Sequence, residues 1–171
     1  MTIPNLLSTS RYLLAAPMAY LVALEIWLMA AVVLWLAIAT DIADGYLARK
    51  SDQVTPIGGL LDHSADAFFV SATLGSLVYL KLVPLVLPVV VVAAFLQYML
   101  DSSALAGKPL RTSSLGRYNG ICYFVLAGFP VMQHAMGIYL IKEAWFFWLG
   151  WGLVLSSLIS MVDRGIAFLK K

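Results

Sequence analysis

Charged residues are scarce in this chain. Asp, Glu, Lys and Arg together make up 12% of its 171 residues, whereas 62% of the residues are hydrophobic. Soluble domains carry roughly 25% charged residues, so the composition excludes a soluble enzyme. It also excludes a disordered chain, because so much apolar surface offsets the entropy lost on ordering. The mean hydropathy of +0.91 indicates a protein that lies in a lipid bilayer.

Cysteine and excess positive charge are also nearly absent. Cys122 is the only cysteine, which excludes an internal disulfide and a cysteine-based metal site. Eleven Lys and Arg against nine Asp and Glu leave a net charge of +2. Such a chain has no basic stripe to follow a phosphate backbone, so we expect no nucleic acid partner.

Long apolar runs, in contrast, fill most of the chain. About 20 residues of α-helix cross the hydrocarbon core of a bilayer. Six runs approach this length, and turn or charge signals separate them. They cover residues 10–24, 27–48, 57–80, 83–104, 116–138 and 144–166. The sequence therefore predicts an all-α integral membrane protein with six transmembrane helices, organised as one domain over residues 1–171.

The two ends of the chain carry further signals. Residues 2–7 favour a short interfacial helix that leads into the first span. The opening lacks a basic leader with a small-residue cleavage site, so we expect no removable signal peptide.

The distribution of Lys and Arg predicts the orientation. In a six-span arrangement, nine of the eleven fall on one side: Arg11, Arg49, Lys50, Lys108, Arg111, Arg117, Arg164, Lys170 and Lys171. Only Lys81 and Lys142 fall on the other. Because positive charge collects on the cytoplasmic side, we expect a multi-pass protein with both termini in the cytoplasm, most simply in a bacterial inner membrane.

Four of the nine acidic residues lie close together, inside apolar runs. They are Asp41, Asp44, Asp62 and Asp66. The first two are three residues apart and the last two are four apart, so each pair shares one face of a helix. Both faces lie at the cytoplasmic ends of neighbouring spans, so we expect all four carboxylates to converge.

Converging carboxylates in a membrane need compensation. Each ionised side chain deep in a span costs about 2.5 to 3.5 kcal/mol even on the mild insertion scale. Arg49 and Lys50 supply two nearby positive charges, whereas two divalent cations balance four carboxylates. Hard oxygen ligands suit Mg²⁺ or Mn²⁺. The sequence thus favours a two-metal site, with helix capping or pairing to cytoplasmic bases as the alternative.

Small residues flank these aspartates. Gly45 and Ala48 follow Asp44, and Gly58 precedes Asp62. Without large side chains the backbone is open to a bulky ligand, although small residues also serve close helix packing in lipid.

Together these residues resemble the signature of the CDP-alcohol phosphatidyltransferase family. The pattern D-x2-D-G-x2-A-R-x8-G-x3-D-x3-D is matched without a gap by Asp41, Asp44, Gly45, Ala48, Arg49, Gly58, Asp62 and Asp66. The resemblance implies a membrane-embedded enzyme, usually a homodimer, in which an alcohol attacks the diphosphate of a CDP-linked substrate and CMP is released.

The resemblance also implies roles for these residues. Asp41, Asp44, Asp62 and Asp66 would hold two divalent cations, Mg²⁺ or Mn²⁺, and Asp66 would also accept the proton of the attacking hydroxyl. A second set would bind the nucleotide and its diphosphate: Asp41, Gly45, Ala48, Arg49 and Gly58. An arginine suits a diphosphate because its guanidinium forms two-point, charge-assisted hydrogen bonds; Arg49 also reads as a cytoplasmic anchor.

The acceptor alcohol is less clearly indicated. Residues 2–8 together with Arg11 resemble the start of bacterial phosphatidylglycerophosphate synthases, and also of cardiolipin synthases. Arg117 and, six residues earlier, Arg111 are candidates to meet an acceptor phosphate, or simply anchor a cytoplasmic loop. The fourth span lacks the Arg-Glu pair typical of the first group. We expect CDP-diacylglycerol as donor and glycerol 3-phosphate as acceptor, in phospholipid biosynthesis.

Other assignments stay open. The acceptor could be phosphatidylglycerol, inositol phosphate or serine, or a diacylglycerol could accept from a CDP-aminoalcohol. A cation transporter also places aspartates in a membrane. A transport path needs polar groups across the whole membrane, however, and the outer halves of these spans are mostly Leu, Val and Phe.

Overall fold

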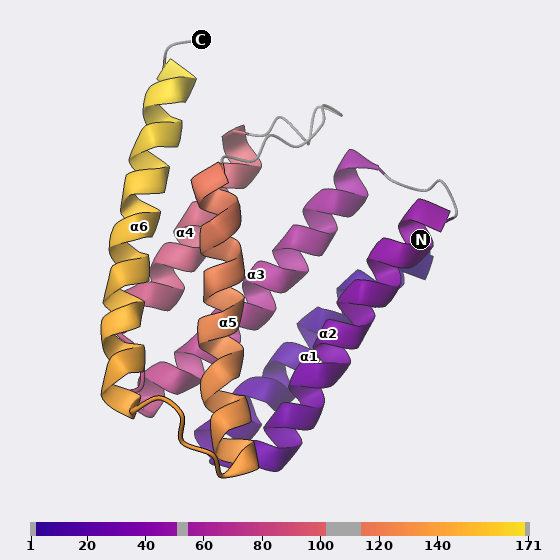
Figure 1. The fold of residues 1–171 in the computed structure, drawn as a ribbon. Helices are drawn as coiled ribbons and strands as arrows, with labels where there is room; N and C mark the ends of the chain where they lie inside the picture. The colour runs from indigo at the N-terminus through magenta and orange to yellow at the C-terminus, as the bar shows by residue number, and fades with distance from the viewer. Residues whose placement is uncertain (1–2, 51–54, 102–113, 170–171) are drawn as a thin grey trace.

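The computed structural model describes residues 3–50, 55–101 and 114–169, and all regular structure in these ranges is helical. These residues form six helices, and Figure 1 shows them arranged as an antiparallel bundle. Their bounds are α1 Ile3–Ala23, α2 Trp27–Lys50, α3 Pro56–Tyr79, α4 Val86–Asp101, α5 Ser114–Met136 and α6 Glu143–Leu169. The predicted all-α class is confirmed, and five of the six predicted spans coincide with a helix to within a few residues.

The start of the chain differs from the prediction. A short interfacial helix separate from the first span was expected over residues 2–7, but α1 runs without interruption from Ile3 to Ala23. The prediction was wrong because nothing between Asn5 and Arg11 breaks a helix. Pro4 stands in the first turn, where its missing N–H removes no helical hydrogen bond.

The three helix connections at one end of the bundle share one turn geometry. Glu25, Lys81 and Gly137 follow α1, α3 and α5 with φ angles of 56°, 61° and 65°. In each case the next residue donates its backbone N–H to the carbonyl five residues earlier, as Leu82 does to Leu77 at 2.9 Å. This pairing closes the last helical turn through a left-handed residue. Gly137 adopts that conformation without strain, whereas Glu25 and Lys81 do so at a cost.

The helices fall into two groups. Helix α1 packs on both α2 and α3, α4 and α6 pack together, and α5 lies against α2 and α6. Figure 1 shows the first three on one side of the bundle and the last three on the other. The interface between the groups is formed by α3 with α4 and by α2 and α3 with α5.

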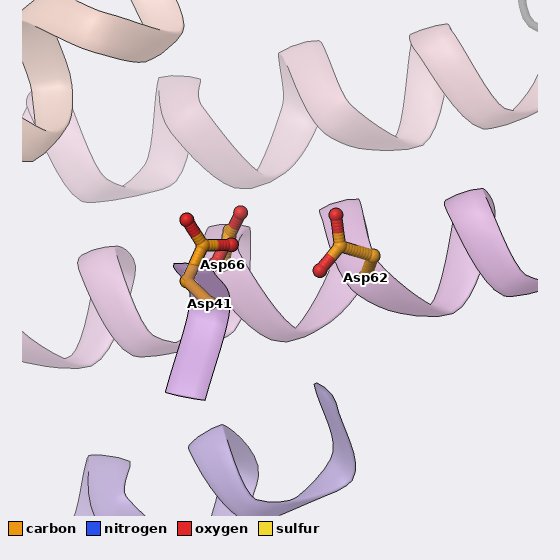
Figure 2. A group of neighbouring side chains, drawn as sticks. All are labelled: Asp41, Asp62 and Asp66. Atoms are coloured by element: carbon orange, nitrogen blue, oxygen red, sulfur yellow. The ribbon is translucent and has the colours of Figure 1, made fainter. Parts of the chain in front are cut away.

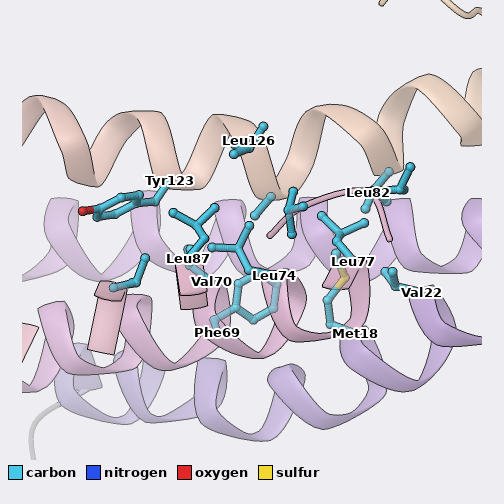
Figure 3. Close-up of a cluster of buried hydrophobic side chains, with 14 of the residues drawn as sticks. Met18, Val22, Phe69, Val70, Leu74, Leu77, Leu82, Leu87, Tyr123 and Leu126 are labelled. Carbon is cyan, nitrogen blue, oxygen red and sulfur yellow. The ribbon is translucent and has the colours of Figure 1, made fainter. Parts of the chain in front are cut away.

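A continuous apolar core fills the half of the bundle near these turns. Met18 and Val22 of α1 meet Leu74 and Leu77 of α3, all of them fully buried (Figure 3). Each such side chain contributes roughly 1.5 to 3 kcal/mol when it leaves water. The other half, where α3 begins, is held differently and contains the polar residues described below.

Two helices in the described ranges are long and apolar enough to span a bilayer. These are α2, with a hydropathy of 1.7, and residues 143–167 of α6, with 1.6. Helix α4 is apolar but short. In α3 the polar residues Asp62, His63 and Asp66 lower the average, so hydropathy alone does not identify it as a span. The six helices are therefore confirmed, and their six-span membrane arrangement stays a prediction.

Candidate active site

The predicted convergence of the two acidic faces is confirmed. Helix α2 carries Asp41 and helix α3 carries Asp62 and Asp66, and these three carboxylates offer oxygen atoms within 4.8 Å of one another. Figure 2 shows Asp41 next to Asp66, with Asp62 one turn along α3. Asp41, Asp62 and Asp66 lie 49%, 28% and 39% exposed, so this three-aspartate group is accessible from outside the bundle.

Asp44 lies beneath this group rather than in it. Its side chain is 5% exposed. Ser8 of α1 donates a hydrogen bond of 2.8 Å to Asp44 Oδ2. Asp44 thus fastens α1 to α2 directly below the exposed carboxylates, and its predicted role as a metal ligand stays a prediction.

A buried arginine lies at the centre of the four aspartates. Arg11 of α1 is 1% exposed. Its Nη1 forms ion pairs with Asp41 and with Asp66 (2.9 Å), and its Nη2 with Asp44 (3.0 Å) and with Asp62. Sequence reasoning looked for compensating charge in Arg49 and Lys50 and counted Arg11 only among the basic residues of the cytoplasmic side. It missed Arg11 as the counter-ion of the aspartates, because this role depends on the packing of α1 against both α2 and α3.

The ligands on offer fit a divalent cation. Asp41, Asp62 and Asp66 present only carboxylate oxygens, which are the donors that Mg²⁺ and Mn²⁺ prefer. Four carboxylates face one arginine, so negative charge remains in excess. We therefore regard the three-aspartate group as a suitable site for a hard divalent cation.

Three of the residues predicted to bind the nucleotide, Gly45, Ala48 and Arg49, follow Asp44 on α2. A methyl group in place of the Gly45 hydrogen would lie 3.3 Å from Arg49 Nη1. The absence of a side chain at Gly45 therefore lets Arg49 fold back along α2, while Ala48 lies half-buried on the same helix.

Gly58 has a different local reason to be small. Its N–H donates to Thr55 Oγ1 at 3.0 Å in the cap of α3, and an added methyl would lie 2.9 Å from that same oxygen. The contact explains Gly58 as part of a helix start, and its role with a nucleotide stays a prediction.

A cavity of about 690 Å³ borders the three-aspartate group. Asp41 and Asp66 belong both to the three-aspartate group and to the wall of this cavity. The rest of the wall comes from α2 to α6 and is largely apolar, with Val70, Val91 and Phe124 among its residues. A volume of this size lies in the range of roughly 300 to 1,000 Å³ that proteins use for organic ligands.

Three buried polar atoms in the cavity residues have no partner. They are Gln97 Oε1, Tyr98 Oη and Asn119 Nδ2. Tyr98 and Asn119 are 7% and 5% exposed. Burying such a group without a hydrogen bond costs about 1 to 3 kcal/mol, and native proteins hold few of them. All three atoms belong to residues that line the cavity, so this wall has hydrogen-bonding capacity that the protein itself does not use.

Two arginines also line the cavity. One is Arg117 of α5, which the sequence predicted for acceptor binding, and the other is Arg164 of α6. The Arg164 guanidinium lies 5.1 Å from the centre of the Tyr98 ring. The second predicted acceptor residue, Arg111, lies outside the described residues.

His63 connects the cluster to the cavity. Its Nδ1 is 3.6 Å from Asp62, and its ring stacks on Tyr98 with 5.6 Å between ring centres. His63 lies in the cavity wall together with Asp66. This placement agrees with a supporting role beside the aspartates.

Sequence reasoning missed Arg11, Tyr98, Asn119 and Arg164 as members of the site. One signal for Arg11 was present: it is the only charged residue of α1, and a lone charge in a membrane helix indicates a partner or a function. Tyr98 and Asn119 gave no such signal, because their lack of partners depends on how α4 and α5 pack.

Known proteins are similar to this sequence over most of its length. Residues 1–156 match the CDP-alcohol phosphatidyltransferase family. The human cardiolipin synthase (CMP-forming) is 33% identical over 124 residues, which cover 71% of this chain and 41% of that protein. The rat cardiolipin synthase is 34% identical over the same shares.

A second kind of relative matches a shorter part. The CDP-diacylglycerol–glycerol-3-phosphate 3-phosphatidyltransferase of Aquifex aeolicus is 39% identical over 69 residues, 40% of this chain and 39% of that protein. The chain spans less than half the length of the curated relatives it matches. The family match and the assembled aspartates agree, and the chain belongs to the CDP-alcohol phosphatidyltransferase family.

Proposed function

We propose that this protein transfers a phosphatidyl group from CDP-diacylglycerol to the hydroxyl of a polar alcohol and releases CMP. The observation that carries the proposal is that Asp41 and Asp66 lie where the aspartate group and the cavity meet. Both belong to the three-aspartate group and to the cavity wall. A diphosphate bound at the aspartates would therefore meet an alcohol bound in the cavity.

The aspartates would hold the cations of the reaction. Asp41, Asp62 and Asp66, with Asp44 beneath them, would bind two ions of Mg²⁺ or Mn²⁺. Such ions neutralise the charge that develops on the entering and leaving oxygens of a phosphoryl transfer. Arg49, which folds back over Gly45 next to Asp44 on α2, would bind the diphosphate of the donor.

Asp66 would accept the proton. In the reaction the acceptor oxygen forms a bond to the phosphorus that bears the diacylglycerol, and the bond from that phosphorus to the bridging oxygen of CMP breaks. The hydroxyl proton passes to a carboxylate oxygen of Asp66, which faces the cavity. A positioned base of this kind contributes about 10² to 10⁴ in rate.

The cavity supports a glyceryl phosphate as the acceptor. Arg117 and Arg164 suit a phosphate, and the unpartnered atoms of Tyr98 and Asn119 suit hydroxyl groups. The sequence favoured glycerol 3-phosphate. The volume and the apolar wall exceed what this small molecule needs, and they favour the lipid form of the same headgroup, phosphatidylglycerol. The likeness to the human and rat cardiolipin synthases supports the same choice.

We also propose that the helices lie in a membrane, with the aspartates at the cytoplasmic side. The surface supports this placement, because large apolar side chains such as Leu13, Leu140 and Trp148 are 76%, 75% and 66% exposed. Several polar side chains, in contrast, are buried: Ser8, Arg11, Asp44, Thr73, Asn119 and Ser157. An apolar exterior around a polar interior is typical of a protein in lipid.

An acceptor panel tests the proposed reaction. The purified protein in nanodiscs receives CDP-diacylglycerol, Mn²⁺ and one acceptor at a time, and CMP release is measured. We expect CMP with phosphatidylglycerol, and less with glycerol 3-phosphate. Preference for glycerol 3-phosphate would restore the acceptor that the sequence favoured. CMP formed only from a CDP-aminoalcohol would show that the proposed donor is wrong.

A further inference from the structure

Arg11 occupies the centre of the site that the proposed function gives to divalent cations. Its two terminal nitrogens contact all four aspartates, two carboxylates to each nitrogen. Asp41, Asp62 and Asp66, which are the candidate metal ligands, are three of these four partners. The guanidinium therefore uses the same carboxylates that a cation would use.

The arrangement leaves Arg11 incompletely satisfied. Its Nε is buried and has no hydrogen-bond partner. One positive charge also faces four carboxylates, so the cluster keeps a net negative charge. A guanidinium held in this way keeps the aspartates together. A divalent cation in its place would neutralise more of the negative charge, so replacing the guanidinium is favourable.

A divalent cation and the guanidinium do not fit the centre together. Carboxylate oxygens bind Mg²⁺ at about 2.1 Å, so the ion would take the place of the arginine nitrogens between Asp41, Asp62 and Asp66. Repulsion between the two positive charges at such short range adds to the conflict. One of them has to leave the centre.

Helix α1 is held in place by contacts that do not involve Arg11. Ser8, one turn earlier, donates to Asp44 at 2.8 Å, and Tyr12 donates to Ser64 at 2.6 Å. The side chain of Arg11 could therefore withdraw while α1 stays packed against α2 and α3.

We propose that Arg11 is a tethered counter-ion that competes with the divalent cation for the aspartates. Without metal it keeps the four carboxylates assembled, and metal binding displaces it. The proposal rests on the proposed function, because it concerns the metal site of that reaction. It assigns Arg11 a positioning role. It predicts that metal binding is reversible and weaker than it would be if the aspartates had no arginine among them.

Manganese binding to an arginine variant tests the proposal. Arg11→Met keeps an unbranched, flexible stem and removes the guanidinium with its charge. Free Mn²⁺ is measured by electron paramagnetic resonance during titration of the purified protein, without substrates. We expect Arg11→Met to bind Mn²⁺ at least ten times more tightly than the wild type. Equal or weaker binding would overturn the proposal.

Two further variants keep the test decisive. Arg11→Lys retains the charge but has fewer donors to reach all four aspartates, so we expect Mn²⁺ binding several times tighter than in the wild type; unchanged binding by a folded Arg11→Lys overturns the proposal even if Arg11→Met fails to fold. Lys50→Met removes one exposed positive charge at the end of the same helix as Asp41. We expect its Mn²⁺ affinity to change less than twofold, and a change as large as that of Arg11→Met would contradict a specific role of Arg11.

Thermal unfolding gives an independent measurement. In the presence of a chelator, Arg11→Met should melt several degrees below the wild type, and Mn²⁺ should remove most of that difference. Equal melting temperatures in chelator would contradict the proposal. CMP release by the wild type is measured on the same preparation, so that failure of the proposed reaction is seen separately from failure of the competition between Arg11 and Mn²⁺.

Discussion

Asp41 and Asp66 lie between two regions of the protein that differ in how their polar groups are hydrogen-bonded. On the side of α1, Asp41 and Asp66 pair with Arg11, and the neighbouring Asp44 accepts a hydrogen bond from Ser8. On the side of α4 and α5 the cavity leaves Tyr98 Oη and Asn119 Nδ2 without a partner. Under the two proposals above, we expect the cluster to bind cations by exchange with Arg11, and the cavity to bind its ligand by completing hydrogen bonds that the protein leaves open.

The largest effect expected on the cluster comes from metal removal. A chelator should reduce CMP release by at least about 10³-fold, because no other group in the cluster replaces the charge on the reacting oxygens. Added Mn²⁺ should restore the rate, since Arg11 keeps the aspartates assembled in the meantime. CMP release and circular dichroism are followed together; full activity in excess chelator would contradict the metal assignment.

The difference between the two regions also decided what the sequence could predict. Spacings of three and four residues place Asp41 and Asp44, and Asp62 and Asp66, on shared helix faces, because such spacing follows from helix geometry alone. Helix α1 packs on both α2 and α3 and brings the two acidic faces together around Arg11. The six helices followed in the same way from the lengths of the apolar runs.

The remaining features depend on contacts between distant segments. Arg11 meets Asp62 from 51 residues away, and its role depends on where α1 begins and how α1 crosses α3. The missing partners of Tyr98 and Asn119 arise only when α4, α5 and α6 enclose the cavity. A lone charge in α1 signals that Arg11 has some partner, but no local pattern identifies that partner, so its place among the aspartates and the cavity were found only in the structure.

A smaller effect is expected from a substitution in the cavity wall, which should weaken acceptor binding without lowering stability. Tyr98→Phe removes a hydroxyl that has no partner, so we expect unchanged or slightly higher stability and a KM for the acceptor raised about tenfold. The KM for CDP-diacylglycerol should stay the same. Steady-state kinetics with each substrate varied in turn measure both values.

Tyr123→Phe is the matched control for that variant. Tyr123 lies in the same cavity wall, but its hydroxyl is hydrogen-bonded to Ser157. Its loss should lower the free energy of unfolding by about 1 kcal/mol and leave the acceptor KM within twofold. If the two variants behave alike, the unpartnered hydroxyl of Tyr98 has no special part in binding.

The smallest effect is expected far from both regions. Lys81 adopts a φ of 61° in the turn after α3, a conformation that glycine reaches without strain. Lys81→Gly should raise the free energy of unfolding by about 0.5 to 1 kcal/mol and leave CMP release unchanged. Thermal unfolding and the CMP assay check both parts; a loss of activity would show that the turn end of the bundle affects the site.

Asp66→Asn tests most directly whether the cluster and the cavity act on one reaction. The variant keeps the size of the side chain and removes the carboxylate that belongs to both regions. With CDP-diacylglycerol and phosphatidylglycerol, we predict that CMP release falls by at least about 10³-fold while the helical circular dichroism spectrum is retained. Asp163→Asn, an exposed position on α6, should keep the wild-type rate. Turnover by a folded Asp66→Asn at the wild-type rate would contradict the account.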